Sequence, residues 1–151
     1  MKKILTGLMT TALGLALVGC QTAPTSETTA PSQAAMEKSM MSVKGSVAYR
    51  ERIALPPNAV VTIKLQDVSL ADAPATMIAE QTFETDGAQV PFDFELSYNA
   101  ADIDSRHRYS VSARIEVDGK LRFINDTAYP VITDQNKTQE VNLLLIGVQG
   151  K

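Results

Sequence analysis

From Val43 onward, apolar side chains recur at every second position, and this period constrains the fold more strongly than any other feature of the chain. In the longest run, residues 109–117, tyrosine, valine, alanine and isoleucine alternate with serine, arginine and glutamate. Side chains of a β-strand point alternately to its two faces, so such a run predicts a strand buried on one face. The runs cover residues 43–49, 61–65, 77–83, 92–96, 109–117, 121–123 and 141–145.

Turn-forming residues separate these runs. Asp118-Gly119 lies between two alternating runs and predicts a hairpin. Asp86-Gly87 indicates a further turn, and residues 99–106 predict a loop or one short helical turn. Short strands separated by frequent turns are typical of two packed sheets. We therefore predict an all-β fold, a single antiparallel β-sandwich of about seven to eight strands over residues 43–148.

Glu51 conflicts with the alternation. Continuing the period of residues 43–49 places Glu51 on the apolar face, with Arg50 and Arg52 facing solvent. A carboxylate that points inward is costly unless it is paired. We expect a bulge or an early strand end to turn Glu51 outward; the alternative is a buried or paired charge, held by an arginine such as Arg114.

The N-terminus carries the features of a secretory signal peptide. Two lysines precede an uncharged apolar run over residues 4–18, which is too short and wrongly flanked for a spanning helix. The motif Leu-Val-Gly-Cys at residues 17–20 resembles the bacterial lipobox. In that class of signal the cysteine is acylated and the peptide is cut before it. We expect residues 1–19 to be removed and Cys20 to carry lipid such as palmitate; the alternative is an ordinary secretory signal with an incidental cysteine.

Residues 20–42 form the expected linker between anchor and domain. They are rich in Gln, Thr, Ala, Pro and Ser and contain few large apolar residues, which predicts a disordered, flexible tether. Removing residues 1–19 leaves 12 of the 14 basic and all 17 acidic side chains, so the net charge falls from −3 to about −5. A mildly acidic protein is a poor match for nucleic acid, and we predict no nucleic-acid partner.

The chain lacks the residues of a recognisable catalytic or metal centre. Cys20 is the only cysteine and His107 the only histidine, so a His/Cys metal site is excluded by count. Asp102 and Asp104 alternate in a loop without the glycine spacing of a calcium loop. We predict no enzymatic activity, no metal and no cofactor, and we interpret His107 as a solvated loop residue.

Partner binding is the remaining function class. The exposed edges of a sandwich can accept an extended peptide as an added strand. Arg50, Arg52 and Arg114 are predicted to point outward from two strands, and they would form a basic partner-binding face if those strands were adjacent. The alternative, which fits better, is a solvated sheet face. Pro130 cannot donate a ladder hydrogen bond, so Tyr129-Pro130 predicts the point where the chain leaves the sheet.

Two long stretches resemble a known protein family. They are GSVAYRERIALPPNAVVTIKLQDVSLADAP at residues 45–74 and ARIEVDGKLRFINDTAYPVIT at residues 113–133. Both are similar to the YbaY/YscW type of small Gram-negative lipoprotein, and the chain is most similar to the YbaY branch. The resemblance covers nearly all of residues 43–146. It implies a compact β-sandwich anchored to the outer membrane, with no catalytic residues to transfer.

The resemblance also implies a class of function. YscW members are pilotins, lipoproteins that escort a type III secretion secretin to the outer membrane. We therefore expect a non-enzymatic binding or assembly accessory of the cell envelope, lipid-anchored in the outer membrane and facing the periplasm. Its expected partner is a secretin or another outer-membrane assembly. The alternative is a lipoprotein that binds or senses envelope polysaccharide or lipid. Gln21 after Cys20 fits outer-membrane sorting, because Asp would be usual for inner-membrane retention.

Overall fold

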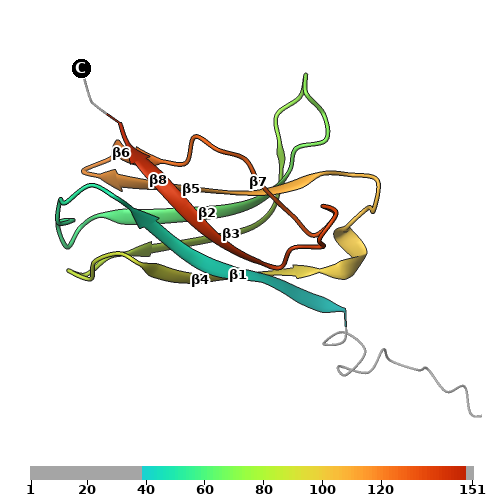
Figure 1. Ribbon diagram of the computed structural model, residues 1–151, viewed down its shortest axis with the longest axis horizontal. Coiled ribbons are helices and arrows are strands. Elements are labelled where there is room, and N and C mark those ends of the chain that lie inside the picture. Colours follow the sequence, from blue (N-terminus) through green and yellow to red (C-terminus); the bar gives the residue numbers. More distant parts are fainter. Residues whose placement is uncertain (1–38, 149–151) are drawn as a thin grey trace, which may run out of the picture. The chain divides into compact units, whose positions relative to one another are not determined.

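The computed structural model describes residues 39–148, and the expected signal peptide and most of the linker lie outside this range (Figure 1). The all-β prediction is confirmed, with eight strands and one 3-10 turn, η1, among the described residues. The strands are β1 (Met40–Tyr49), β2 (Val60–Asp67), β3 (Thr76–Glu84), β4 (Phe92–Asn99), β5 (Tyr109–Val117), β6 (Lys120–Ile124), β7 (Tyr129–Val131) and β8 (Glu140–Gly147), and η1 spans Ala100–Asp102.

The strands form one hydrogen-bonded sheet that curls into a nearly closed, barrel-like arrangement. The order is β3-β2-β5-β6-β8-β1-β4, with β7 beside β5. The predicted separation into two sheets of a sandwich is therefore wrong. The reason is β8, which pairs with β1 up to Leu145 and then with β6 through Ile146 and Gly147. The fully antiparallel prediction is also wrong, because β1 and β8 run parallel.

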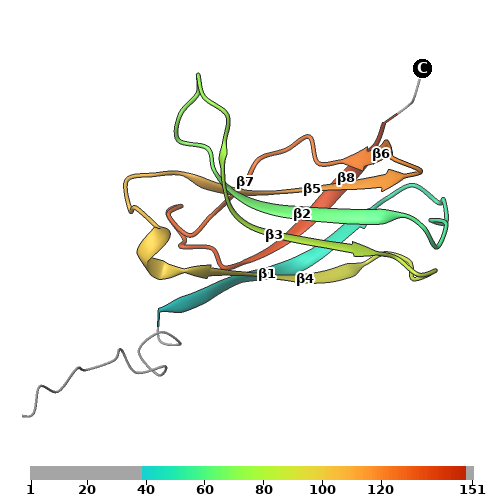
Figure 2. The ribbon, with the colours of Figure 1, turned by 180° about the vertical axis from the view of Figure 1, so that it is seen from behind.

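The curled sheet is closed by side chains where its two edge strands meet. No backbone ladder joins β3 to β4 in the described part of the chain, although they follow each other in sequence. Instead, the backbone N–H of Glu95 donates to Gln81 Oε1 at 3.0 Å. The rings of Phe83 and Phe92 meet edge to face at 5.8 Å. Figures 1 and 2 both show the two strands diverging from this contact toward the opposite end.

The core consists of the inward-facing residues of the alternating runs. In β4, for example, the burial pattern alternates strictly along Phe92–Asn99. Burying each large apolar side chain contributes about 1.5–3 kcal/mol relative to exposure, so this alternation is what holds the strands together. The most deeply buried large residues are Tyr109, Ile63, Leu65, Leu96, Ile115, Leu143, Leu145, Val43, Val47, Val61, Val111 and Val131.

Strand β1 begins at Met40, three residues before the predicted strand start at Val43. The predicted linker includes residues 40–42, but these residues pair with the end of β4, where Met41 lies opposite Tyr98. Backbone pairing with a neighbouring strand requires no apolar alternation, and Met-Met-Ser at residues 40–42 does not alternate, so the sequence did not indicate this pairing.

The predicted turns are present. Asp118 and Gly119 both adopt positive φ, at 52° and 71°, as a two-residue hairpin between β5 and β6 requires. Asp86 and Gly87, in the turn between β3 and β4, also have positive φ values, of 47° and 86°. In the predicted loop at residues 99–106, η1 forms the short helical turn, and the Asn99 side chain accepts a hydrogen bond from the Ala101 N–H.

Tyr129-Pro130 does not leave the sheet as predicted. Both residues belong to β7, which pairs with the start of β5. The proline is tolerated because β7 has three residues and Ser110 of β5 lies opposite Pro130. The Ser110 hydroxyl lies 3.2 Å from both the N–H and the carbonyl oxygen of Tyr129, so a side chain supplements the ladder there.

Candidate functional site

Two adjoining hollows lie at the end of the domain where β1 begins. The end hollow has a volume of about 270 Å³.

 The side hollow measures about 440 Å³, and the two adjoin because Thr133 lines both. The end hollow is lined chiefly by Met41, Tyr98, Ile103, Ile132, Lys137 and Gln139. The side hollow is lined chiefly by Val68, Arg108, Ser110, Pro130, Thr133 and Gln135.

The loop between β7 and β8, residues 132–139, separates the two hollows and is held by a single carboxylate. Asp134 accepts hydrogen bonds from the N–H of Asn136 at 3.1 Å and from the N–H and hydroxyl of Thr138 at 2.7 and 2.8 Å. These bonds, led by that from the Thr138 N–H, lower the pKa of Asp134. The Ile132 N–H also donates to the Thr138 carbonyl oxygen. The loop is therefore fixed by its own residues.

Ile132 adopts an unfavourable backbone conformation at the base of this loop. Its φ is 67°, in the left-handed region that β-branched residues rarely adopt. The Thr133 hydroxyl donates to the His107 carbonyl oxygen at 2.7 Å and ties the loop to the segment before β5. Strain of this kind persists only where surrounding contacts enforce it, and it is common at ligand-binding sites.

Tyr98 lines the end hollow with an unsatisfied hydroxyl group. The residue is 3% exposed, and its hydroxyl has no hydrogen-bond partner among the described residues. Burial raises the pKa of this hydroxyl. The other three tyrosines all have partners: the Tyr49 hydroxyl donates to the Ile53 carbonyl, and those of Tyr109 and Tyr129 accept from backbone N–H groups. Buried polar groups are normally paired, so Tyr98 is an exception that requires an explanation.

The β2–β3 loop, residues 68–75, borders the side hollow and stands away from the rest of the domain in both ribbon views (Figure 2). Its base is held by a hydrogen bond from the Val68 N–H to the Arg108 carbonyl oxygen at 2.8 Å. The Arg108 N–H donates in turn to the Ser69 hydroxyl oxygen. Leu70 on this loop is 72% exposed. The base of the loop is thus fixed, and the loop carries an exposed aliphatic side chain.

His107 is an exposed loop residue, as the sequence predicted, but its side chain also has a partner. Its Nδ1 lies 2.6 Å from Asp67 Oδ2, so it connects the segment before β5 to the end of β2. The Ser69 hydroxyl donates to Asp67 Oδ1, and this bond is the main reason that the pKa of Asp67 is lowered. A nucleophilic serine requires a base beside its hydroxyl. Here the hydroxyl faces the carboxylate and not the imidazole, so the three residues do not form a catalytic relay.

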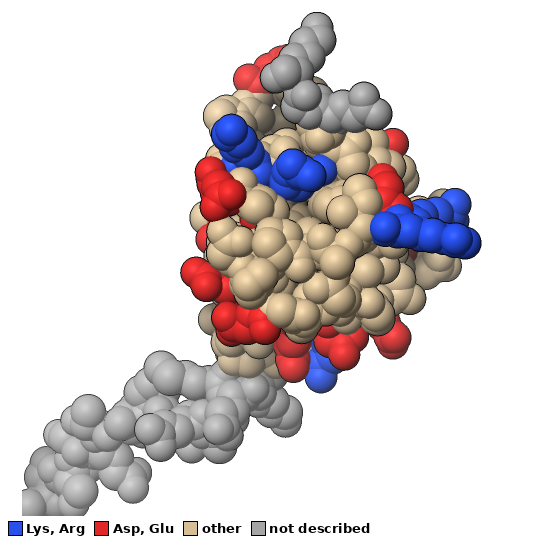
Figure 3. All heavy atoms as spheres, turned by 90° about the vertical axis from the view of Figure 1, so that its left-hand side faces the viewer, with Lys and Arg blue, Asp and Glu red and all other residues tan. Residues whose placement is uncertain are grey.

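The three predicted arginines are not brought together. Arg50 and Arg52 lie beyond the end of β1, in the loop that leads to β2. Arg114 lies in β5, and strands β6 and β8 separate β5 from β1 in the sheet. Figure 3 views the end of the domain that carries the β1–β2 loop, where basic side chains are separated by uncharged and acidic ones. Arg114 itself lies 3.6 Å from Glu116.

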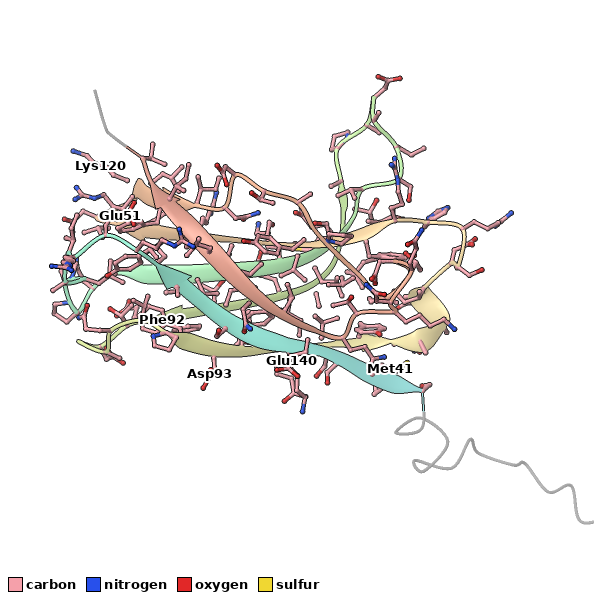
Figure 4. The ribbon with its side chains drawn as sticks, in the orientation of Figure 1. Met41, Glu51, Phe92, Asp93, Lys120 and Glu140 are labelled. Carbon is pink, nitrogen blue, oxygen red and sulfur yellow. The ribbon has the colours of Figure 1, made fainter. Side chains whose placement is uncertain are left out.

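Glu51 turns outward because β1 ends at Tyr49. Its carboxylate accepts a hydrogen bond from the Gly147 N–H at 2.8 Å, at the end of β8. This bond is the largest cause of the lowered pKa of Glu51. Figure 4 places Glu51 and Met41 at opposite ends of the domain, so Glu51 is remote from the two hollows.

Sequence reasoning missed Tyr98 and the 132–139 loop. Tyr98 continues the alternation of β4 and therefore resembles an ordinary core residue. The polar run at residues 133–138 could have indicated an ordered loop, since Asp and Thr side chains often form hydrogen bonds with nearby backbone groups. Within residues 39–148, no helix is suited to crossing a membrane, and no cluster of three or more His, Cys, Asp or Glu side chains is arranged to hold a metal ion.

Comparison with known proteins identifies the family. The model of the type III secretion system lipoprotein chaperone YscW matches residues 38–143. The chain belongs to the YscW family. Over 107 residues it is 48% identical to the uncharacterized lipoprotein YbaY of Escherichia coli (strain K12), a match that covers 71% of this chain and 55% of YbaY. The chain thus spans about half the length of this relative.

A solved structure agrees with this assignment. The structure of an alternative pilotin from the type II secretion system of Vibrio cholerae is similar to this chain, with 68% sequence identity and a TM-score of 0.72. The match covers 74% of this chain and 99% of the pilotin chain. The resemblance to the YbaY/YscW type is therefore confirmed.

Proposed function

We propose that this YscW-family chain is a lipid-anchored lipoprotein of the outer membrane that assists the assembly of a secretion channel, as pilotins do. The observation that carries the proposal is the 68% identity to a type II secretion pilotin over nearly the whole of that pilotin chain. The partner we propose is a secretin or a comparable outer-membrane assembly. The domain would bind this partner in the periplasm without catalysing a reaction.

The proposed anchor is lipid on Cys20, followed by the linker at residues 20–42. Each methylene that enters the bilayer contributes about 0.8 kcal/mol, so several acyl chains anchor a protein stably. The linker composition suits a flexible tether with a span of about 25 Å. Such a tether would let the domain reach a partner, while the lipid determines the membrane to which the lipoprotein and its partner are delivered.

Metabolic labelling with palmitate and membrane fractionation test the anchor. The wild-type chain should incorporate label and sediment with outer membranes, whereas Cys20→Ala should incorporate none and leave that fraction. Ser26→Ala, in the linker, is the matched control and should behave like wild type. Labelling of the Cys20→Ala variant would contradict the proposed lipidation site.

Envelope crosslinking in living cells tests the assembly role. A secretin or another outer-membrane assembly should be recovered with wild type and not with Cys20→Ala. In a deletion strain, that assembly should also be depleted from the outer-membrane fraction. Recovery of polysaccharide or lipid alone, with normal channel assembly in the deletion strain, would overturn the proposal and favour a ligand-binding lipoprotein.

A further inference from the structure

We propose that the end hollow receives an aliphatic side chain of a partner protein, from a segment that also carries an acidic residue. This inference rests on the proposed accessory function and names the chemistry of the partner segment and its binding site. Three groups define the site: the apolar lining with Tyr98 at its base, the cations Lys137 and Arg108, and the fixed loop at residues 132–139.

The apolar lining explains why an aliphatic side chain fits. Met41, Ile103 and Ile132 surround a space of about 270 Å³, which accommodates a side chain of leucine size. Met41 is paired with Tyr98 across the β1–β4 ladder and is exposed. A methionine side chain adapts easily to a neighbour, so Met41 can move aside and admit a group to the base of the hollow.

The Tyr98 hydroxyl supplies a hydrogen bond for the entering segment. Leaving a buried polar group unpaired costs free energy, and a partner that provides the missing bond recovers it. A backbone carbonyl or N–H beside the inserted side chain satisfies this requirement. An acyl chain does not, because its buried methylenes offer no hydrogen-bonding group. The unpaired Tyr98 hydroxyl therefore favours a peptide over a lipid as the occupant of the end hollow.

Among the described residues that line the two hollows, the charged side chains without a partner are the basic ones. Arg108 and Lys137 line them and form no ion pair within residues 39–148. Asp134 is the one acidic residue in the described linings, and its carboxylate already accepts three hydrogen bonds from its own loop. An acidic residue on the partner therefore complements this end of the domain.

The loop at residues 132–139 holds these groups in place before a partner arrives. Asp134 fixes the loop, and the enforced conformation of Ile132 positions its side chain in the lining. A site that is already ordered loses less conformational entropy on binding. This preorganisation is what distinguishes the end hollow from an incidental depression.

Site-specific photocrosslinking in living cells tests the proposal with the full chain. A photoreactive p-benzoylphenylalanine replaces Ser105, which lines the end hollow, and in a control strain it replaces Lys120. Figure 4 shows Lys120 at the end of the domain opposite Met41. Mass spectrometry then identifies the crosslinked peptide. We expect a protein segment with an aliphatic residue within about four positions of Asp or Glu, and at least a fivefold lower yield at Lys120.

Matched variants separate binding from folding. Tyr98→Phe should reduce the crosslink yield at Ser105 at least fivefold without lowering the Tm, because the hydroxyl has no partner in the fold. Tyr49→Phe should keep the yield while lowering the Tm, because it loses its bond to Ile53. Lys137→Glu should also reduce the yield, and Lys137→Arg should retain it.

Several outcomes would overturn the inference. They are a lipid adduct at Ser105, a captured segment without an acidic residue, equal yields at Ser105 and Lys120, or yields unaffected by Tyr98→Phe and Lys137→Glu. None of these results depends on whether the deletion strain assembles its secretion channel. Normal assembly in that strain contradicts the proposed function itself, whereas the crosslinks test the site.

Discussion

At the residue scale, Gly45 shows how a single position depends on contacts far away in sequence. A Cβ atom on Gly45 would lie 1.7 Å from the carbonyl oxygen of Val141 in β8. The obstructing atom belongs to the backbone of a paired strand, so a side-chain movement cannot relieve the overlap. The sequence around Gly45 does not indicate this close approach, since the period of two predicts only that the position faces inward.

Gly45→Ala should therefore lower the free energy of unfolding by about 3 kcal/mol or more, because β1 and β8 must separate to admit the methyl group. Urea unfolding followed by circular dichroism measures the change. Ser46→Ala is the neighbouring control and should cost less than about 1 kcal/mol, since its hydroxyl makes an exposed hydrogen bond. An effect of Gly45→Ala as small as that of the control would contradict the close approach.

At the scale of elements, the alternating runs predicted seven of the eight described strands and did not predict β7. Strand β7 has three residues, too few for a period to emerge, and it contains Pro130. Strand β3 was predicted with Met77 on its apolar face, yet Met77 is exposed. The pairing with β2 shifts there, since Leu65 faces Ala79 and Gln66 faces Met77. A bulge of this kind changes the face that a residue occupies.

Two substitutions in β8 test the alternation directly. Leu143 is buried, whereas Ile146 is 43% exposed. Leu143→Ala should lower the free energy of unfolding by about 2–5 kcal/mol because it leaves a cavity in the core. Ile146→Ala should cost less than about 1 kcal/mol. Chemical denaturation of both variants gives the comparison, and equal losses would mean that β8 is rotated relative to this description.

The 132–139 loop should respond to acid. The pKa of Asp134 is lowered in the folded state, chiefly by the Thr138 N–H. The carboxylate therefore stabilises the loop fully above its unfolded pKa of about 4 and loses this effect as the pH falls through the lower folded value. NMR shifts of the Thr138 and Asn136 amides between neutral and strongly acidic pH measure this transition.

Asp134→Asn is the control for the acid response, because the amide does not titrate. In this variant the Thr138 amide shift should lose the transition that is due to residue 134. A wild-type transition centred at or above the pKa of an ordinary aspartate would contradict the proposed role of the carboxylate.

At the scale of the whole domain, the last strand completes the fold. Strand β8 connects β1 to β6, and its pairing with β1 joins residues nearly one hundred positions apart, such as Gly45 and Val141. Such long-range pairing must overcome a large loss of chain entropy before it stabilises the fold. Without β8, the sheet has two additional open edges and lacks the buried side chains of Leu143 and Leu145.

A chain that ends at Gln139 should therefore fail to fold cooperatively. Thermal denaturation followed by circular dichroism should show no sharp transition for this truncated chain, in contrast to the full chain. The Leu143→Ala variant, which keeps the backbone of β8, should retain a sharp transition at a lower temperature. A cooperative transition in the truncated chain would show that β8 is an accessory strand.

Seven of the eight described strands, the hairpin at Asp118-Gly119 and the family could be predicted from the sequence alone, because they depend on local periods, turn residues and motifs. The three-dimensional arrangement was needed to show how the strands close on one another, which group pairs with Glu51 and which groups surround the end hollow. Tyr98, Lys137 and Met41 come from three separate segments, and the sequence of each segment carries no information about the other two. A contact between distant segments depends on the register of the whole sheet, and only folding determines that register.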